Sequence, residues 1–478
     1  MFNHFSLYVK KNKMQFSFLI FGLIAVILSL LNIKIGIALV VSLSFIFLIT
    51  LDIRYILHAL LFSFCFTIPI IKTNFGPSIF IRLDDIFYFI VLISFLLKML
   101  TRKIVLRKNK LFYPIVFYVF AIIMSLASVF QYNDVTAIKY AIYHVFKISQ
   151  YFSIFIFVQT FIEDKDIKNY LKIVWISGLF TSIIGLLQKY SILAAYTYEY
   201  ARIGKNITGD QYTSGITGYL SFHYAYLGIY MMIVIFVTLA LFESSKNFLV
   251  KICYLSSIIL FIVIIIYSYS MAAIGVFIIS LFLFIMSNKK YRKYIIFLLP
   301  ITIIYIYILL QNSNLFLYIN KIFSRDISST TLGSRFIIWY KFFQYYPDSL
   351  LQLFFGVGFM GFRYFLYPTT GGWGAHNNFL TVLGETGIIG LISFIILLIK
   401  IYMYILKNYK KSTIPLLKKY NYCLIFAYTG ILITLITQET FSVVSSFASF
   451  LGFFMFLLGL SRGDTVLDIE GNERKDAS

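Results

Sequence analysis

Long apolar runs alternate along this chain with short polar clusters that hold most of its charges. The runs 16–31 and 254–286, for example, contain no charged residue. An apolar run of about 18 residues or more is long enough to cross the hydrocarbon layer of a membrane as a helix. The pattern predicts about 14 such helices, at 15–32, 35–51, 55–71, 84–100, 111–130, 140–162, 170–189, 218–242, 249–267, 270–287, 294–310, 378–406, 421–437 and 441–460.

These helices predict an all-α polytopic membrane protein with one transmembrane domain over 1–460 and a polar, disordered cytoplasmic tail over 461–478. The run 378–406 is too long for one upright span, so we expect it to be tilted or to begin as an external helix. The two long polar segments are 190–217 and 311–377. An active site is expected in the larger one, between spans eleven and twelve.

Composition supports the same class of protein. Hydrophobic residues make up 60% of the chain and charged residues 13%, and the mean hydropathy is +0.88, beyond what a soluble core needs. The net charge of +22 could suggest nucleic-acid binding, but the charges lie between spans. With a cytoplasmic N-terminus, 28 of the 41 lysines and arginines are inside and 12 outside, and Lys147 lies within a span. This positive-inside bias predicts that both termini are cytoplasmic and excludes nucleic acid as the partner.

The loop 311–377 contains an aromatic-rich helix that we expect to begin at Arg335, with Ser334 as its cap, and to end at Pro347. Such a helix would lie in the membrane interface with its aromatic residues toward lipid. It could simply rest on the membrane. Alternatively, Arg335 points at an anionic headgroup, because a guanidinium binds phosphate oxygens with two donors.

The segment Gly356–Gly361 reads as a literal GxGxxG motif. A dinucleotide site would need a preceding strand and a βαβ unit, and neither is predicted around this segment. The glycines are better explained by a tight turn that places Arg363 near the membrane surface.

A glycine-rich stretch leads into His376, Asn377 and Asn378 at a predicted helix start. Imidazole can donate or accept a proton near neutral pH, which favours a functional role for this histidine over a structural one. Glu385 follows nine residues later, on the opposite face of an unbroken helix. The flanking glycines could break the helix and bring Glu385 back toward His376.

Other charged candidates lie outside that loop. Arg202 in 190–217 is either ordinary loop charge or a second external anion contact. Lys147 lies within the sixth span, where a buried cation needs a partner and could line a cavity for an anionic headgroup. Asp84 and Asp85 follow Arg82 at the start of the fourth span. Helix capping explains them more simply than paired acid–base chemistry.

No metal or cofactor is expected. The five histidines, at positions 4, 58, 144, 223 and 376, lack the spacing of metal ligands. Cys65, Cys253 and Cys423 all lie within apolar runs and are expected to be packing residues.

Several of these motifs occur in an order that resembles the core signature of the O-antigen ligase and O-antigen polymerase superfamily. They are Arg335 with Trp339, the turn Gly356–Gly358, the segment Ala375–Asn377, and Glu385 followed by Gly387. The resemblance is strongest over 200–460 and extends weakly to Asp85. In one departure, many relatives carry a Ser-Arg pair where this chain reads Ser268-Tyr-Ser-Met.

The resemblance implies a metal-independent glycosyltransferase in the bacterial cytoplasmic membrane. Its donor would be a glycan on undecaprenyl pyrophosphate, presented at the outer face. His376 would act on the acceptor hydroxyl and Arg335 on the pyrophosphate. Arg202, Arg363, Asn377, Asn378, Glu385 and Lys147 would bind substrate. Membrane lipids and a chain-length regulator are further expected partners.

The sequence motifs leave three functions open. The favoured one is a polymerase that joins repeat units of a surface polysaccharide such as O-antigen, capsule or exopolysaccharide. The second is a ligase that transfers finished glycan to lipid A core or another acceptor. The third is a lipid-glycan flippase, which should show inverted repeats or broken helices around a midplane site. No inverted repeats or broken helices are predicted from the sequence.

Overall fold

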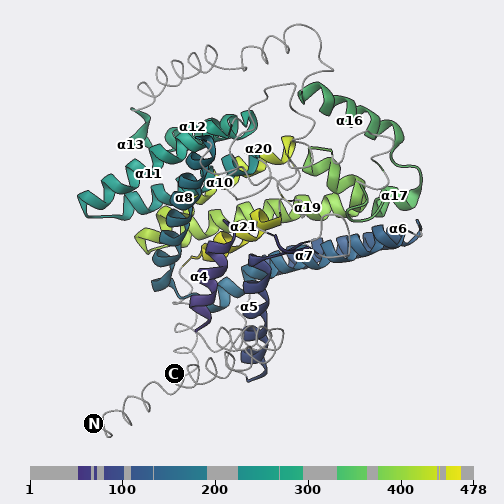
Figure 1. The fold of residues 1–478 in the computed structure, drawn as a ribbon, viewed down its shortest axis with the longest axis horizontal. Helices are drawn as coiled ribbons and strands as arrows, with labels where there is room; N and C mark the ends of the chain where they lie inside the picture. Colours follow the sequence, from purple (N-terminus) through teal and green to yellow (C-terminus); the bar gives the residue numbers. More distant parts are fainter. Residues whose placement is uncertain are drawn as a thin grey trace, which may run out of the picture. The chain divides into compact units, whose positions relative to one another are not determined.

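The computed structural model describes residues 52–65, 69–72, 80–101, 109–132, 134–190, 224–268, 270–293, 331–362, 366, 375–438, 441 and 448–463 (Figure 1). The spans predicted at 15–32, 35–51 and 294–310 lie outside these residues. So do Arg202, Arg363 and nearly all of the segment 190–217.

The chain forms two compact units. The first contains residues 1–60 and 85–106, and the second contains 61–84 and 107–478. Within the described part of the first unit, most of α5 (Leu83–Leu100) follows the predicted fourth span. Helix α4 (Ile53–Ser63) begins in this unit, where Asp52 accepts a hydrogen bond from the backbone N–H of Arg54 at 3.0 Å.

The predicted third span, 55–71, is wrong in its second half. Helix α4 ends at Ser63, and strand β1 (Pro69–Lys72) pairs antiparallel with strand β2 (Phe80–Arg82). Proline lacks the backbone N–H that continues a helix, and β-branched isoleucines at 70 and 71 favour an extended chain. The hydropathy of this run is the same in either structure, so hydropathy alone predicted a helix.

Apart from strands β1 and β2, the described part of the second unit is built of helices, as the apolar pattern predicted (Figure 1). Helix α21 packs against α7, α10 against α11 and α20, and α19 against α6 and α20. In the described residues, seven helices are long and apolar enough to cross a membrane. The elements are α6 (Phe112–Phe130), α7 (Val135–Phe161), η1 (Asp164–Asp166), α8 (Ile167–Lys189), α10 (Tyr224–Ser244), α11 (Phe248–Tyr267), α12 (Met271–Ser287), α13 (Lys289–Arg292), α16 (Thr331–Tyr345), α17 (Leu350–Phe355), α19 (Asn378–Lys411), α20 (Pro415–Thr437) and α21 (Ala448–Leu460).

Burial differs strongly between these helices. Helix α10 is apolar on all sides and almost completely buried, as expected for a helix surrounded by others. Helices α6 and α11 expose large apolar side chains along one face, which suits contact with lipid. Of the three cysteines, Cys65 and Cys423 are buried as expected, while Cys253 is exposed on α11.

Helices α6 and α19 are antiparallel and define two ends of the second unit. Near the start of α6, Asn109 donates to the hydroxyl of Tyr404 in the last third of α19, at 3.4 Å. Further along α6, Tyr118 lies against Phe394, with ring centroids 5.3 Å apart. The start of α19, at His376, and the end of α21, at Arg462, therefore belong to opposite ends.

Candidate active site

Helices α16 and α17 pack against the first part of α19 through a small core of their own. Phe342 stacks on Tyr346 and on Phe362, with centroid distances of 4.9 and 5.9 Å. The Tyr346 hydroxyl lies within hydrogen-bond distance of the Gln352 and Leu383 carbonyls, at 2.6 and 2.8 Å. Burial raises the pKa of Tyr346, which keeps the hydroxyl protonated as a donor. The full core is Phe342, Tyr346, Val357, Phe362, Leu366 and Ala375, with Leu380 and Leu383 against it.

Helix α16 begins earlier than predicted. It starts at Thr331, so Ser334 lies inside its first turn and is not its cap. It ends at Tyr345, just before Pro347 as expected. The outward face exposes Phe336, Tyr340 and Phe343 by 60%, 70% and 62%. An exposed aromatic face is the feature expected of an interfacial helix, and the position of α16 at the membrane surface stays a prediction.

Helix α19 is broken at Gly387, where φ is +67° and ψ is −167°. The long run 378–406 is therefore two helical parts joined at this residue. A break of this kind displaces the N–H groups that would bond the preceding carbonyls. Those carbonyls are satisfied by the turn after α17: Val357 donates to Gly384 at 2.8 Å, and Gly358 donates to Glu385 at 3.0 Å.

This backbone docking explains the glycines of the GxGxxG segment. Gly356 has φ +74°, and a Cβ there would lie 2.3 Å from the carbonyl carbon of Glu385. Gly358 has φ +100° and faces Val129 of α6. The segment follows a helix and not a strand, so the structure agrees with the exclusion of a dinucleotide site.

The same turn is fixed to α6. The backbone N–H of Phe359 donates to the Ser125 hydroxyl at 3.1 Å, and Gln352 donates to the Tyr132 hydroxyl at 3.2 Å. The α16–α17 segment is thus held by both α6 and α19, which makes it a rigid support.

His376 lies at the start of α19 and is exposed. Its φ is +48°, a left-handed conformation that is uncommon for residues other than glycine. Both neighbours are fixed: the Trp339 indole donates to the Ala375 carbonyl at 2.7 Å, and Asn377 caps the helix. Strained backbone that is held on both sides is typical of functional positions.

Arg335 is half-buried on α16, one helical turn before Trp339 and therefore on the same face. Because Trp339 contacts the residue next to His376, Arg335 and His376 lie on adjoining segments of one surface. The structure thus places these two residues on neighbouring segments of the chain.

Three further predicted site residues belong to α19. The side-chain oxygen of Asn377 accepts from the N–H groups of Phe379 and Leu380, and that of Asn378 accepts from Phe441 at 3.3 Å. Glu385 is buried. The helix break comes after Glu385, so the glycines do not return its side chain toward His376 in the way the sequence allowed.

Lys147 belongs to a buried polar cluster on α7. Its ammonium lies 5.8 Å from the ring centroids of Tyr143 and Tyr151. The Tyr151 hydroxyl donates to Asp84 at 3.1 Å and accepts from Arg82 at 2.6 Å, and Arg82 faces Asp84 at 3.5 Å. The sequence analysis missed the roles of Arg82 and Tyr151. The sequence did contain a signal for this cluster: Arg82 lies two residues before Asp84 near the start of a span, where charged residues need partners.

Across the described ranges, no group of three or more histidine, cysteine, aspartate or glutamate side chains comes together in a way that would hold a metal ion. An imidazole can move a proton and a guanidinium can bind phosphate oxygens, and here the two side chains belong to neighbouring segments of the chain.

The long apolar helices and this surface define the class: an all-α, multi-pass membrane protein with a glycine-turn scaffold at one end. Residues 256–395 match the family model described as O-antigen ligase, which supports placement in the O-antigen ligase and polymerase superfamily. The match includes Arg335, the glycine turn, His376 and Glu385, and confirms the resemblance drawn from their order. It indicates a glycosyl-transferring enzyme. No curated protein matches the chain.

Proposed function

We propose that this protein polymerises oligosaccharide repeat units linked to undecaprenyl pyrophosphate, at the outer face of the bacterial cytoplasmic membrane. The observation that carries the proposal is His376, exposed and held in a strained conformation beside the Arg335 helix. This site lies inside the segment that matches the O-antigen ligase model. The positive-inside bias supports a topology in which the site is external and both termini are cytoplasmic.

In the proposed reaction, a hydroxyl of the acceptor sugar attacks the anomeric carbon of the donor glycan. The bond between that carbon and the pyrophosphate oxygen breaks, and the lipid pyrophosphate leaves with the electron pair. His376 accepts the hydroxyl proton. Arg335, with Arg202 and Arg363, stabilises the charge that develops on the pyrophosphate, so the reaction requires no metal.

The remaining candidates are proposed to bind substrate. Asn377 and Asn378 lie next to the proposed base, and because their side-chain oxygens already accept backbone hydrogen bonds, their amide NH₂ groups are the donors proposed for sugar hydroxyls. Glu385 is proposed to bind substrate at the same end of α19. Lys147 is proposed to pair its buried ammonium group with an anionic headgroup. A chain-length regulator is the proposed protein partner.

The test is reconstitution of the purified full chain in liposomes with a lipid-linked repeat unit. We expect a ladder of polymer, and we expect it to persist in excess EDTA. Activity that EDTA abolishes and Mg²⁺ or Mn²⁺ restores would contradict the metal-free mechanism. Transport of the lipid-linked glycan without formation of a glycosidic bond would instead indicate a flippase.

A ligase remains the second candidate, because the matching family is described by that activity. The size of surface glycan in a deletion strain separates the two. Single-repeat products would support the polymerase, and accumulation of long lipid-linked chains would support the ligase.

A further inference from the structure

At the opposite end of the second unit from His376, a cavity of about 890 Å³ lies between the start of α6 and the last third of α19. The end of α21 contributes Arg462 and Gly463 to its lining. The volume is within the range of pockets that hold small organic ligands. The charge pattern assigns this end to the cytoplasm.

The polar lining of the cavity is strongly basic. None of the residues lining this cavity, all of them in the described part of the chain, is acidic. Three of the lysines recur along one face of α19, which makes that side of the cavity basic over about three helical turns. The basic residues are Lys110, Lys400, Lys407, Lys411 and Arg462.

The other wall of the cavity is apolar and faces outward. Tyr113 and Phe117 on α6 are 77% and 44% exposed, and Met403 on α19 is 54% exposed. They lie on the apolar, membrane-spanning parts of α6 and α19, next to the basic end of the cavity. A basic rim above an apolar wall matches a molecule with an anionic head and hydrocarbon chains.

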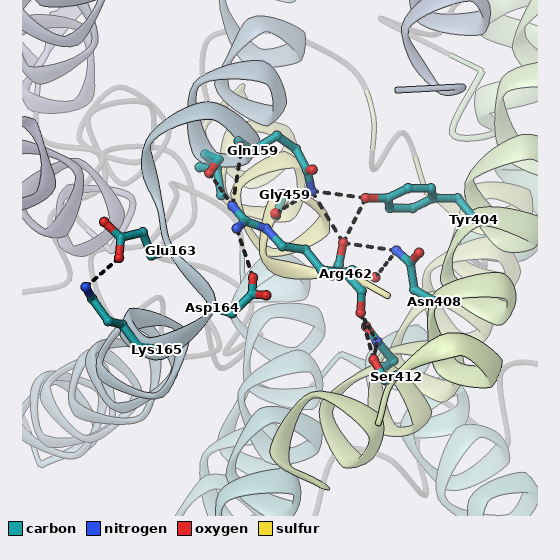
Figure 2. A network of polar contacts seen from close by, with 12 residues as sticks. Gln159, Glu163, Asp164, Lys165, Tyr404, Asn408, Ser412, Gly459 and Arg462 are labelled. Atoms are coloured by element: carbon teal, nitrogen blue, oxygen red, sulfur yellow. Dashed lines mark hydrogen bonds and ion pairs between the residues drawn. The ribbon is translucent and has the colours of Figure 1, made fainter. Parts of the chain in front are cut away.

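The floor of the cavity is formed by a network of hydrogen bonds and an ion pair around Arg462, drawn in Figure 2. The Arg462 guanidinium pairs with Asp164 at 3.1 Å and donates to the Val158 carbonyl at 2.9 Å. The Ser461 carbonyl accepts from Tyr404 at 2.8 Å and from Asn408 at 3.0 Å. With one basic residue already held in this network, the exposed lysines are the groups that meet an incoming anion.

We propose that this cavity binds an anionic phospholipid, with its phosphate at the lysines of α19 and its acyl chains along α6. Basic pockets between membrane helices on the cytoplasmic side are known to suit such headgroups. The bound lipid would bridge α6, α19 and the end of α21. This site is separate from the proposed glycosyl-transfer surface and does not depend on that function.

The test is native mass spectrometry of the purified full chain with equal amounts of phosphatidylglycerol and phosphatidylcholine. Wild type should retain phosphatidylglycerol preferentially. The variant Lys400→Gln/Lys407→Gln/Lys411→Gln should lose that preference by about tenfold or more, since each lysine near an anionic headgroup contributes substantially. Phosphatidylglycerol should also raise the Tm of wild type, because a ligand of the folded state stabilises it, and not that of the variant.

The matched control is Lys168→Gln/Lys172→Gln/Lys246→Gln, which removes the same charge from exposed lysines that do not line the cavity. It should keep the wild-type preference. Equal losses in the two variants would show general attraction to anionic lipid and overturn the proposal, as would an unchanged preference in the α19 variant. Release of the lipid by millimolar inorganic phosphate would overturn the role of the apolar wall.

Discussion

His376 combines an exposed imidazole with a backbone that is held in the left-handed region. Asparagine also tolerates that conformation but has no group that titrates near neutral pH. The two properties can therefore be separated by substitution.

Replacing His376 by Asn or Ala should lower the rate of polymer formation by roughly 10²–10⁴-fold, because a positioned base is removed from a weak nucleophile. Protein level and binding of lipid-linked donor should survive in His376→Asn. The measurements are single-turnover rates and donor affinity in liposomes. A loss of affinity in proportion to the loss of rate would place His376 in the pyrophosphate site and refute the assignment as a base.

Arg335→Lys keeps the charge of α16 but not the forked geometry of the guanidinium. Because a lysine cannot donate to two phosphate oxygens in the same plane, this variant should lose most of its activity. Lys341→Gln, on the same helix, serves as the control and should keep near-normal activity. Wild-type rates in Arg335→Lys would show that Arg335 is only a surface charge.

At the scale of elements, the break in α19 is what allows the segment after α17 to dock. Two carbonyls released near Gly387 receive the N–H groups of Val357 and Gly358. The docked turn, the α16–α17 core and the start of α19 then support one another, and His376 and Arg335 lie on this common scaffold.

Gly387→Ala should destabilise the protein. Its backbone conformation is essentially restricted to glycine, at a cost of about 1–3 kcal/mol for other residues, and a Cβ would lie 2.3 Å from the Phe354 carbonyl. The control is Gly275→Ala in α12, where nothing lies within 4 Å of the added Cβ. Thermal unfolding in detergent should show a lower Tm for the first variant and little change for the second. Equal Tm values would mean that the break is not required.

At the scale of the whole molecule, the charge pattern predicts which residues face each side of the membrane. In a background without Cys65, Cys253 and Cys423, Asp348→Cys should react with an impermeant thiol reagent in intact cells, and Lys410→Cys only after permeabilisation. Both positions are exposed, so labelling reports the side and not burial. The reverse result would invert the topology and remove the external site.

The sequence predicted most described helices because each membrane span carries its own apolar signal, independent of its neighbours. It failed at 69–72, where proline and isoleucine form a strand that is as apolar as a helix. It also assigned Ser461 and Arg462 to a disordered tail, although both are buried in contacts with residues far away in the chain.

In the site, too, local features could be predicted from the sequence and contacts between distant residues could not. His376 and Arg335 could be proposed from the sequence because their residue types and local context carry information, and their roles stay predictions. The Tyr151 contacts with Arg82 and Asp84 join residues nearly 70 positions apart, and periodicity does not register such pairs. The sequence allowed a helix break at the glycines that flank Glu385, but it did not show that another segment caps the freed carbonyls, because that is a tertiary property.

The docking of the glycine turn onto α19 also determines which positions of this segment can tolerate substitution. Peptide groups are common to every residue type, so a joint made of N–H and carbonyl groups constrains side chains only where space or φ demands glycine. Val357 can change to another apolar residue and still donate to Gly384, whereas Gly356 and Gly387 cannot change without a clash. A deep mutational scan should therefore find a few intolerant glycines among permissive neighbours, so that the scaffold can persist while the side chains of the surrounding surface change.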